Sequence, residues 1–163
     1  MVAKMDIYSD EHISQERSFR YIHIITKNVI GILSRISSLM RRKRYNMEEV
    51  SVSFDDQGRA HMIVAIDGRL HDVHHVIEQV RRLYDVIDVY DTTHQREHLF
   101  FAIYVTVPSE RDFKLFPMQP NRIVELDGLV KGIFTVSLED VATLMDYILE
   151  EKFPYIRRIM GLI

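Results

Sequence analysis

Apolar and polar residues follow two different periods at the start of this chain. Over residues 18–26, apolar side chains fall on both faces of a period-two pattern, which predicts a central strand covered on both sides. From Gly31 the period becomes helical, and the helix is expected to run to about Arg44. Its apolar stripe consists of Ile32, Leu33, Ile36, Leu39 and Met40.

Two further strands and a second helix follow. Residues 46–54 and 60–66 alternate as strands, and residues 55–58 are typical of the turn between them. The second helix is expected from an apolar stripe of Leu70, Val73, Ile77, Val80 and Leu83. A short strand at residues 86–90 ends the series. Because both crossovers must be right-handed, the order predicts a ferredoxin-like βαββαβ fold with both helices on one face of an antiparallel sheet.

The second half repeats this outline with one helix missing or reduced. Its strand patterns lie at residues 99–107, 122–127, 130–136 and 155–159. Pro117 and Pro120 interrupt residues 108–120, so no regular element is expected there. A helix is predicted to begin at the N-cap Ser137 and to end near Lys152, because Pro154 cannot continue it.

The chain is therefore expected to be an α+β protein with two domains. We predict a flexible leader at residues 1–17, a first domain at residues 18–91, a polar linker at residues 92–98 and a smaller, reduced α+β domain at residues 99–163. Two domains of this size each bury only a modest core.

Composition excludes several classes of protein. The 163 residues are 47% hydrophobic and 28% charged, which is typical of a globular chain. There is no cysteine, so disulfides and thiolate chemistry are excluded, and the formal net charge of −3 gives no pull toward nucleic acid. No apolar run approaches the roughly 20 residues that cross a membrane, and the N-terminus lacks the apolar stretch of a secretory signal. We expect a cytoplasmic protein.

The junction between the first strand and the first helix is the candidate binding site. A glycine there, Gly31, lets a small anion approach backbone N–H groups, and the helix dipole favours that anion. Asn28 and Asn46 flank the helix, a pattern that favours binding of a small amino acid through its carboxylate. The alternative is that Gly31 only eases a tight turn and that both asparagines satisfy loop backbone. Selectivity would require apolar walls such as Ile32 and Leu33.

These residues carry a resemblance to a known family. The stretch NVIGILSRISSLMRRKRYNMEEVSVS, followed by MIVAIDG and VIEQVRRLYDVIDVYD, resembles the ACT domain of the acetohydroxyacid synthase (acetolactate synthase) small regulatory subunit. That family typically shows Asn-x-x-Gly, an aliphatic pair and Ser-Arg, and later Arg-x-Tyr-Asn-Ile. The linker residues 94–97 also resemble the His-x-x-Arg-Glu of the family. The resemblance covers residues 18–107.

The resemblance implies a regulatory subunit without catalytic residues or cofactors of its own. Its partner would be a catalytic large subunit that carries thiamine diphosphate, Mg and FAD, and it would activate that subunit. The effector would be valine, leucine or isoleucine, bound where two ACT domains meet in a homodimer. By matching positions, Asn28, Gly31, Ile32 and Leu33 would come from one chain, and Asn46 and Met47 from its neighbour.

Three departures from the family keep other interpretations open. Arg44 stands where the family usually has glycine, and Lys27 stands where an acid is common. The second domain also lacks the usual helix after its first strand. The chain could therefore be a free-standing amino-acid sensor, or a dimerisation module that responds to no effector and acts on another protein. An unrecognised enzyme is disfavoured because no nucleophile and base occur at a useful spacing.

Histidines and arginines give weaker signals. His71, His75 and Glu78 would share one face of the second helix at a spacing that could hold a metal, but a solvated surface is the expected explanation. The basic run at residues 41–44 is expected to complement the helix dipole and not to bind nucleic acid, because no aromatic residues accompany it. We predict no metal site and no catalytic site.

Overall fold

The computed structural model describes residues 18–95 and residues 99–161, which form two compact units. The predicted leader, residues 1–17, lies outside the described residues, as do residues 96–98 of the predicted linker. None of the helices in the described ranges is long and apolar enough to cross a membrane.

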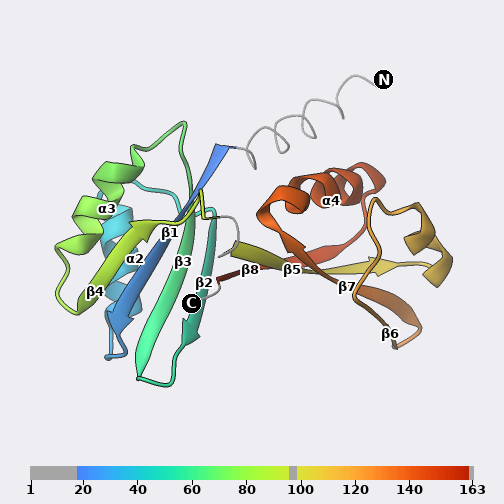
Figure 1. Cartoon of the computed structure of the whole chain (residues 1–163), viewed down its shortest axis with the longest axis horizontal. Helices are drawn as coiled ribbons and strands as arrows, with labels where there is room; N and C mark the ends of the chain where they lie inside the picture. The colour runs from blue at the N-terminus through green and yellow to red at the C-terminus, as the bar shows by residue number, and fades with distance from the viewer. Residues whose placement is uncertain (1–17, 96–98, 162–163) are drawn as a thin grey trace. The chain divides into compact units, whose positions relative to one another are not determined.

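The first unit has the predicted order of elements (Figure 1). They are β1 (Phe19–Lys27), α2 (Ile32–Arg42), β2 (Glu49–Phe54), β3 (Arg59–Asp67), α3 (Val73–Arg81) and β4 (Val86–Asp91). The four strands form one antiparallel sheet in the order β2-β3-β1-β4, and both helices cover the same face of it. The predicted ferredoxin-like βαββαβ fold is thus confirmed.

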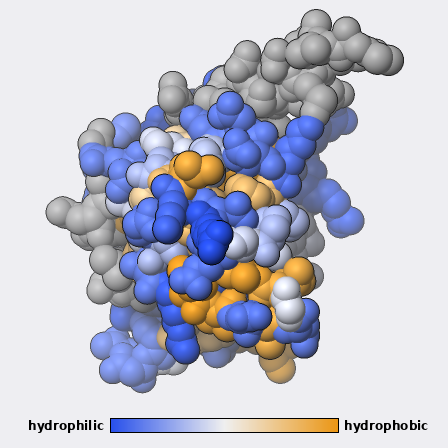
Figure 2. All heavy atoms as spheres, turned by 90° about the vertical axis from the view of Figure 1, so that its right-hand side faces the viewer, coloured by the Kyte–Doolittle hydropathy of each residue, from blue (hydrophilic) through white to orange (hydrophobic). Residues whose placement is uncertain are grey.

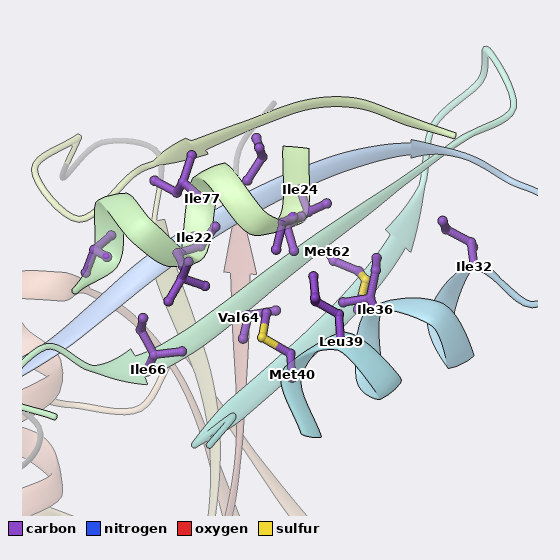
Figure 3. Close-up of a cluster of buried hydrophobic side chains, with 14 residues drawn as sticks. Ile22, Ile24, Ile32, Ile36, Leu39, Met40, Met62, Val64, Ile66 and Ile77 are labelled. Carbon is purple, nitrogen blue, oxygen red and sulfur yellow. The ribbon is translucent and has the colours of Figure 1, made fainter. Parts of the chain in front are cut away.

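The hydrophobic core of this unit lies between the sheet and the two helices (Figure 3). Ile22 and Ile24 of β1 are fully buried there, opposite Ile36 of α2 and Val76 of α3. Each such side chain stabilises the fold by about 1.5–3 kcal/mol relative to exposure. On the other face of β1, Tyr21 is buried as well, so the prediction of a central strand with both faces covered is confirmed.

The connection from α2 to β2 differs from the prediction in its boundaries. The helix ends at Arg42, and the N–H of Tyr45 donates to the carbonyl of Met40 at 2.8 Å, which closes the last turn. Arg44 adopts a left-handed conformation with φ 58°. β2 begins only at Glu49, and the preceding Tyr45 and Met47 turn their side chains toward the core.

The second helix is shorter than its apolar stripe suggested. Asp72 caps α3 by accepting a hydrogen bond from the backbone N–H of His74 at 3.0 Å, so the helix begins at Val73. Leu70 is exposed ahead of this cap, whereas Leu83 packs against the core beyond the helix end. Apolar residues outside the helix had therefore extended the apparent stripe at both ends.

The second unit repeats the strand order of the first. Its elements are β5 (Leu99–Val107), the 3-10 helix η2 (Glu110–Leu115), β6 (Arg122–Leu126), β7 (Leu129–Ser137), α4 (Leu138–Glu151) and β8 (Tyr155–Gly161). The antiparallel sheet has the order β6-β7-β5-β8, in which each strand takes the place of its counterpart in the first unit. η2 replaces the first helix, so the prediction of a reduced second α+β domain is confirmed.

An aromatic cluster holds η2 in place. The Phe113 ring is buried and lies 5.1 Å from the Phe116 ring and 6.0 Å from the Phe134 ring, measured between centroids. Gly132 of β7 leaves room for it, since a Cβ built there would lie 2.5 Å from Phe113 ring atoms. Residues 110–115 therefore form a packed 3-10 helix in a segment that was expected to be irregular throughout, whereas the stretch around Pro117 and Pro120 has no regular element, as predicted.

The second unit also exposes large apolar side chains. Leu115, Leu126 and Leu129 are all exposed, and one face of the molecule shows hydrophobic patches among hydrophilic residues (Figure 2). Contiguous apolar surface of this kind is typical of interaction sites. At the other end of the unit, Ser137 caps α4 as predicted by accepting from the N–H of Asp140, and Lys152 ends the helix.

Candidate ligand site

The turn between β1 and α2 is built around Gly31. This residue has φ 82° and ψ 1°, a left-handed conformation that costs other residues roughly 1–2 kcal/mol. The N–H of Ile32 donates to the carbonyl of Val29 at 3.3 Å, which tightens the turn just before the helix. A Cβ built on Gly31 would meet nothing within 4 Å, so the space beside the glycine is open.

The start of α2 is not capped by any side chain. Gly31 offers no side-chain acceptor, and the first turn of the helix contains no acidic residue. After the N–H of Ile32, the next backbone donor that returns to the turn is the N–H of Arg35, 3.0 Å from the carbonyl of Gly31. The N–H groups of Leu33 and Ser34 have no partner in the described part of the chain, as expected for the first turn of a helix. They can donate to an anion, which the helix dipole would favour by about 0.3–2 kcal/mol.

A small pocket opens beside this helix start. It has a volume of about 120 Å³, close to the roughly 150 Å³ of an engineered cavity that holds benzene. It therefore suits a ligand with a side chain of a few carbon atoms. The residues that line it come from the turn, α2, β2 and β3: Asn28, Val29, Gly31, Ile32, Leu33, Val52, Phe54 and Ala60.

The structure brings four of the six predicted site residues together in this pocket: Asn28, Gly31, Ile32 and Leu33. Asn46 and Met47 lie beyond the opposite end of α2, and a helix of 11 residues spans about 16 Å. Met47 packs against the core of its own unit, whereas Asn46 is exposed. Within one chain, the two asparagines are therefore too far apart to hold the same small molecule.

The sequence patterns did not predict the residues that form the far wall of the pocket. Val52 and Phe54 of β2 and Ala60 of β3 complete it. The alternation of Val50, Val52 and Phe54 does indicate that these side chains share a face. It does not indicate that β2 lies at the edge of the sheet beside α2, which depends on strand order.

Lys27 and Arg44, the two substitutions that depart from the family pattern, do not block the pocket. Lys27 turns toward the start of β4, with its Nζ 4.0 Å from Asp85 Oδ1 and 5.8 Å from the centre of the Tyr84 ring. Arg35 holds the other oxygen of Asp85 at 3.0 Å. Neither Lys27 nor Arg44 is among the residues that line the pocket.

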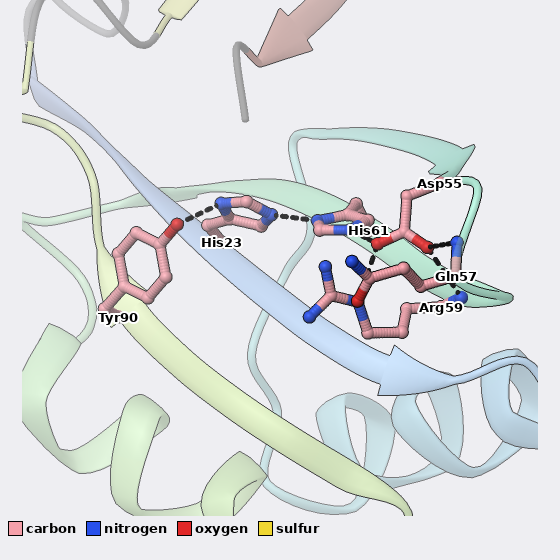
Figure 4. Close-up of polar contacts among 6 residues, drawn as sticks. All are labelled: His23, Asp55, Gln57, Arg59, His61 and Tyr90. Atoms are coloured by element: carbon pink, nitrogen blue, oxygen red, sulfur yellow. Dashed lines mark hydrogen bonds and ion pairs between the residues drawn. The ribbon is translucent and has the colours of Figure 1, made fainter.

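A chain of hydrogen bonds holds the turn between β2 and β3, which directly follows Phe54 (Figure 4). The hydroxyl of Tyr90 lies 2.7 Å from His23 Nδ1, and His23 Nε2 lies 2.9 Å from His61 Nδ1. His61 Nε2 in turn lies 2.8 Å from Asp55 Oδ2. The residues come from β4, β1, β3 and the turn, so only the folded sheet brings them together.

The charge of Asp55 sets the direction of its hydrogen bond with His61. The hydrogen bond from His61, followed by that from the backbone N–H of Arg59, holds the pKa of Asp55 well below its usual range. Since Asp55 is ionised, His61 Nε2 donates to it, and His61 Nδ1 and His23 Nδ1 extend the chain to His23 and Tyr90. Every member is satisfied, so the network positions the turn next to the pocket.

The histidines of the α3 region do not form the expected stripe. His71 precedes the cap of α3, so it does not share a helix face with His75 and Glu78. The rings of His71 and His75 instead lie edge-on to Tyr45, with centroids at 5.3 and 6.4 Å. Within residues 18–95 and 99–161, no three or more His, Cys, Asp or Glu side chains are grouped so that they could hold a metal.

The βαββαβ order and the single antiparallel sheet define the first unit as a ferredoxin-like α+β domain of the ACT type. Residues 22–88 match the family model described as the AHAS small subunit-like ACT domain. Over these residues the chain matches that family, and the resemblance predicted from the sequence is confirmed.

Relatives in three organisms support this assignment. The acetolactate synthase small subunit of Aquifex aeolicus is 34% identical over 98 residues, which cover 55% of this chain and 51% of the relative. That of Bacillus subtilis is 27% identical over 129 residues, 76% of this chain and 67% of the relative. The probable small subunit of Archaeoglobus fulgidus is 31% identical over 115 residues, 68% of this chain and 66% of the relative. The chain thus spans about half to two thirds of these proteins.

A solved structure agrees with the fold. The acetolactate synthase small subunit of Thermotoga maritima superimposes with a TM-score of 0.67 at 13% sequence identity, and the match covers 89% of this chain and 98% of that one. At this identity the likeness concerns the fold.

Proposed function

We propose that this chain is the small regulatory subunit of an acetolactate synthase and that its first unit binds a branched-chain amino acid. The family of residues 22–88 and the relatives named above support the regulatory role. Thiamine diphosphate, Mg and FAD would belong to the catalytic partner. The chain acts by binding, in the cytoplasm, and performs no chemistry itself.

The open pocket at the uncapped start of α2 carries this proposal. The effector carboxylate accepts hydrogen bonds from the N–H groups of Leu33 and Ser34. Its branched side chain contacts Ile32, Val52 and Phe54, which form apolar walls. A pocket of about 120 Å³ favours an aliphatic side chain of three or four carbons over a large aromatic one.

A second copy of the chain completes the site. β2 is an edge strand of the first unit, and an unpaired edge is a template for another strand. Beside it lies an apolar seam in which Leu33 is 44%, Val50 42% and Phe54 62% exposed. Two β2 strands that pair antiparallel about a two-fold axis extend the sheet and cover this seam on both copies.

The same pairing explains why Asn46 lies far from the pocket of its own chain. In an antiparallel pair, the start of one β2 lies beside the end of the other. The partner's Asn46, which precedes β2, is thereby brought next to Phe54 and the pocket. The effector then spans the seam and contacts both chains.

Regulation follows if two arrangements of this seam differ in affinity for the effector. The effector shifts the population toward the arrangement that it binds more tightly. The catalytic subunit responds to the surface that this arrangement presents, and the exposed apolar residues of the second unit, such as Leu115 and Leu126, supply further area for contact.

Calorimetry on a matched pair of variants tests the site. Gly31→Asp places a carboxylate where the effector carboxylate would lie, and it should weaken binding of valine, leucine and isoleucine by more than about 100-fold through like-charge repulsion. Gly31→Asn has the same shape without the charge, and asparagine tolerates the left-handed conformation. It should bind much more tightly than Gly31→Asp. Equal binding by wild type and Gly31→Asp would refute the placement.

Co-purification tests the partner. The chain should be retained by the catalytic subunit of an acetolactate synthase, and valine should change the activity of the complex. A chain that binds the amino acid but not the catalytic subunit is a free-standing sensor. A chain that dimerises without taking up any amino acid is a dimerisation module.

A further inference from the structure

We propose that the partner subunit's Glu48 binds the ammonium group of the effector. This inference rests on the proposed effector site and names the residue that distinguishes an amino acid from a simple carboxylate. The effector is a zwitterion, so a selective site needs an acceptor for the ammonium group as well as donors for the carboxylate.

The pocket within one chain supplies no such anion. None of the eight residues that line it has an ionisable side chain. Asn28 offers a neutral amide oxygen, which binds an ammonium group less strongly than a carboxylate does. A partner residue is therefore required if the ammonium is to be neutralised.

Asp85 and Asp55, two acids of the first unit, are already engaged in ion pairs and hydrogen bonds within their own chain. Asp85 is mostly buried and is shared by Arg35 at 3.0 Å and Lys27 at 4.0 Å. Asp55 follows Phe54, but its two oxygens accept from His61 and from the backbone N–H groups of Gln57 and Arg59. Neither carboxylate is available to a ligand without loss of these bonds.

Glu48 lies beyond the C-terminal end of α2, where a neighbouring residue orients its carboxylate. The side-chain amide of Asn46 donates to Glu48 Oε1 at 2.6 Å, and both residues are exposed. Since Tyr45 and Met47 turn toward the core, Asn46 and Glu48 point outward. Asn46 thus holds one oxygen of the carboxylate, and the other oxygen has no partner in the described structure.

The two-fold pairing of β2 strands carries Glu48 to the pocket. If the two-fold axis passes through Ser51, near the middle of β2, the partner's Glu48, which directly precedes β2, lies opposite Phe54. Directly opposed residues of paired strands have their Cβ atoms about 4.5–5.5 Å apart on one face of the sheet. The effector ammonium would then lie between the partner's Glu48 and the start of α2.

The test compares two ligands on two proteins. Valine and 3-methylbutanoate, which is valine without its amino group, are titrated into the full chain and into Glu48→Gln by calorimetry. The introduced glutamine side chain can still accept from Asn46, so the variant removes charge and preserves shape. We expect Glu48→Gln to bind valine about 10- to 100-fold more weakly and 3-methylbutanoate with unchanged affinity.

Two further variants serve as controls. Glu49→Gln removes the adjacent acid on the opposite face of β2, and Asp56→Asn removes an exposed acid in the neighbouring turn. Both should bind valine as the wild type does. Sedimentation should show that all three variants remain dimers.

The outcomes separate this inference from the proposed function. If Glu48→Gln binds valine as tightly as the wild type, or loses both ligands equally, the role of Glu48 is overturned and the effector site stands. If Asp56→Asn loses valine selectively, Asp56 and not Glu48 binds the ammonium. If the wild type binds no branched-chain amino acid, the proposed function fails and the inference fails with it.

Discussion

The first unit leaves the start of its first crossover open, whereas the second unit closes the corresponding position with its own side chains. In the first unit Gly31 begins α2 without a side-chain cap. In the second unit Ser109 accepts from the N–H of Arg111, and Asp112 accepts from the N–H of Ser109, so η2 carries a capping box. The two units share a strand order, but only the first offers free helical N–H groups at this place among the described residues.

The two units also differ in what fills the space beyond the crossover. In the second unit Phe113 packs into the gap left by Gly132 and joins a cluster of aromatic rings. In the first unit, a cavity of about 120 Å³ remains beside Gly31. The comparison indicates that the same strand order carries an uncapped helix start in one unit and a capped 3-10 helix anchored by aromatic rings in the other.

Removing the aromatic anchor of η2 should have the largest effect on stability. Phe113→Ala leaves a cavity in the second unit and should lower its free energy of unfolding by about 3–5 kcal/mol. Urea unfolding with hydrogen exchange localised to each unit measures this. Leu115→Ala is the matched control on the same helix: Leu115 is 74% exposed, so the change should stay within about 0.5 kcal/mol. Equal losses in the two variants would contradict the packing argument.

Opening the cap of η2 should have a smaller effect. Ser109→Ala removes the acceptor for the N–H of Arg111 and should destabilise the second unit by about 1 kcal/mol. Ser37→Ala removes an exposed serine inside α2 and should change stability by no more than about 0.5 kcal/mol. Hydrogen exchange of the η2 amides reports the difference, and unaltered protection in Ser109→Ala would show that the cap contributes nothing.

Restoring the family glycine at the end of α2 should stabilise the first unit slightly. Arg44 has φ 58°, and glycine adopts this conformation without strain, so Arg44→Gly should raise the free energy of unfolding by about 0.5–1 kcal/mol. Arg42→Gly, inside the same helix, should lower it by a similar amount. If both variants destabilise the unit, the left-handed conformation at residue 44 carries no strain.

The stability of the first unit should fall when the pH drops below about 4, and it should not change near pH 7. The side-chain hydrogen bond from Arg69 lowers the pKa of Asp67 to about 2, below the roughly 3.9 of an unfolded chain. A carboxyl with a lowered pKa stabilises the fold above its unfolded pKa, and this contribution is lost as pH falls from about 4 to about 2. The stability of wild type should fall over that range, and that of Asp67→Asn, already lower at pH 7, should fall less. Urea midpoints between pH 7 and pH 2 measure the difference.

Local patterns in the sequence were enough to predict the order of strands and helices and the residues of one wall of the candidate site. Strand and helix periods depend on which face of each element is buried, so β1, α2 and the hairpin after it could be located in advance. The glycine at residue 31 marked the turn because few other residues adopt its conformation. Boundaries were less accurate where apolar residues such as Leu70 and Met47 lie outside the regular element.

Contacts between distant segments could not be predicted in this way. The β2 and β3 walls of the pocket, and the chain from Tyr90 to Asp55, join residues that are close only after the strands have paired. The compact η2 was missed for the same reason, since the prolines of its segment were visible but the gap at Gly132 was not.

By itself, the sequence determined the alternation of strands and helices, the family of residues 22–88 and the flexible glycine at the start of α2. Only the tertiary structure decided that this helix start stays uncapped, whereas its counterpart in the second unit carries a capping box and packs Phe113 against other aromatic rings. The physical reason is that periodicity and backbone preference act over a few neighbouring residues. Whether a cavity remains depends on the volumes of side chains that arrive from several strands at once.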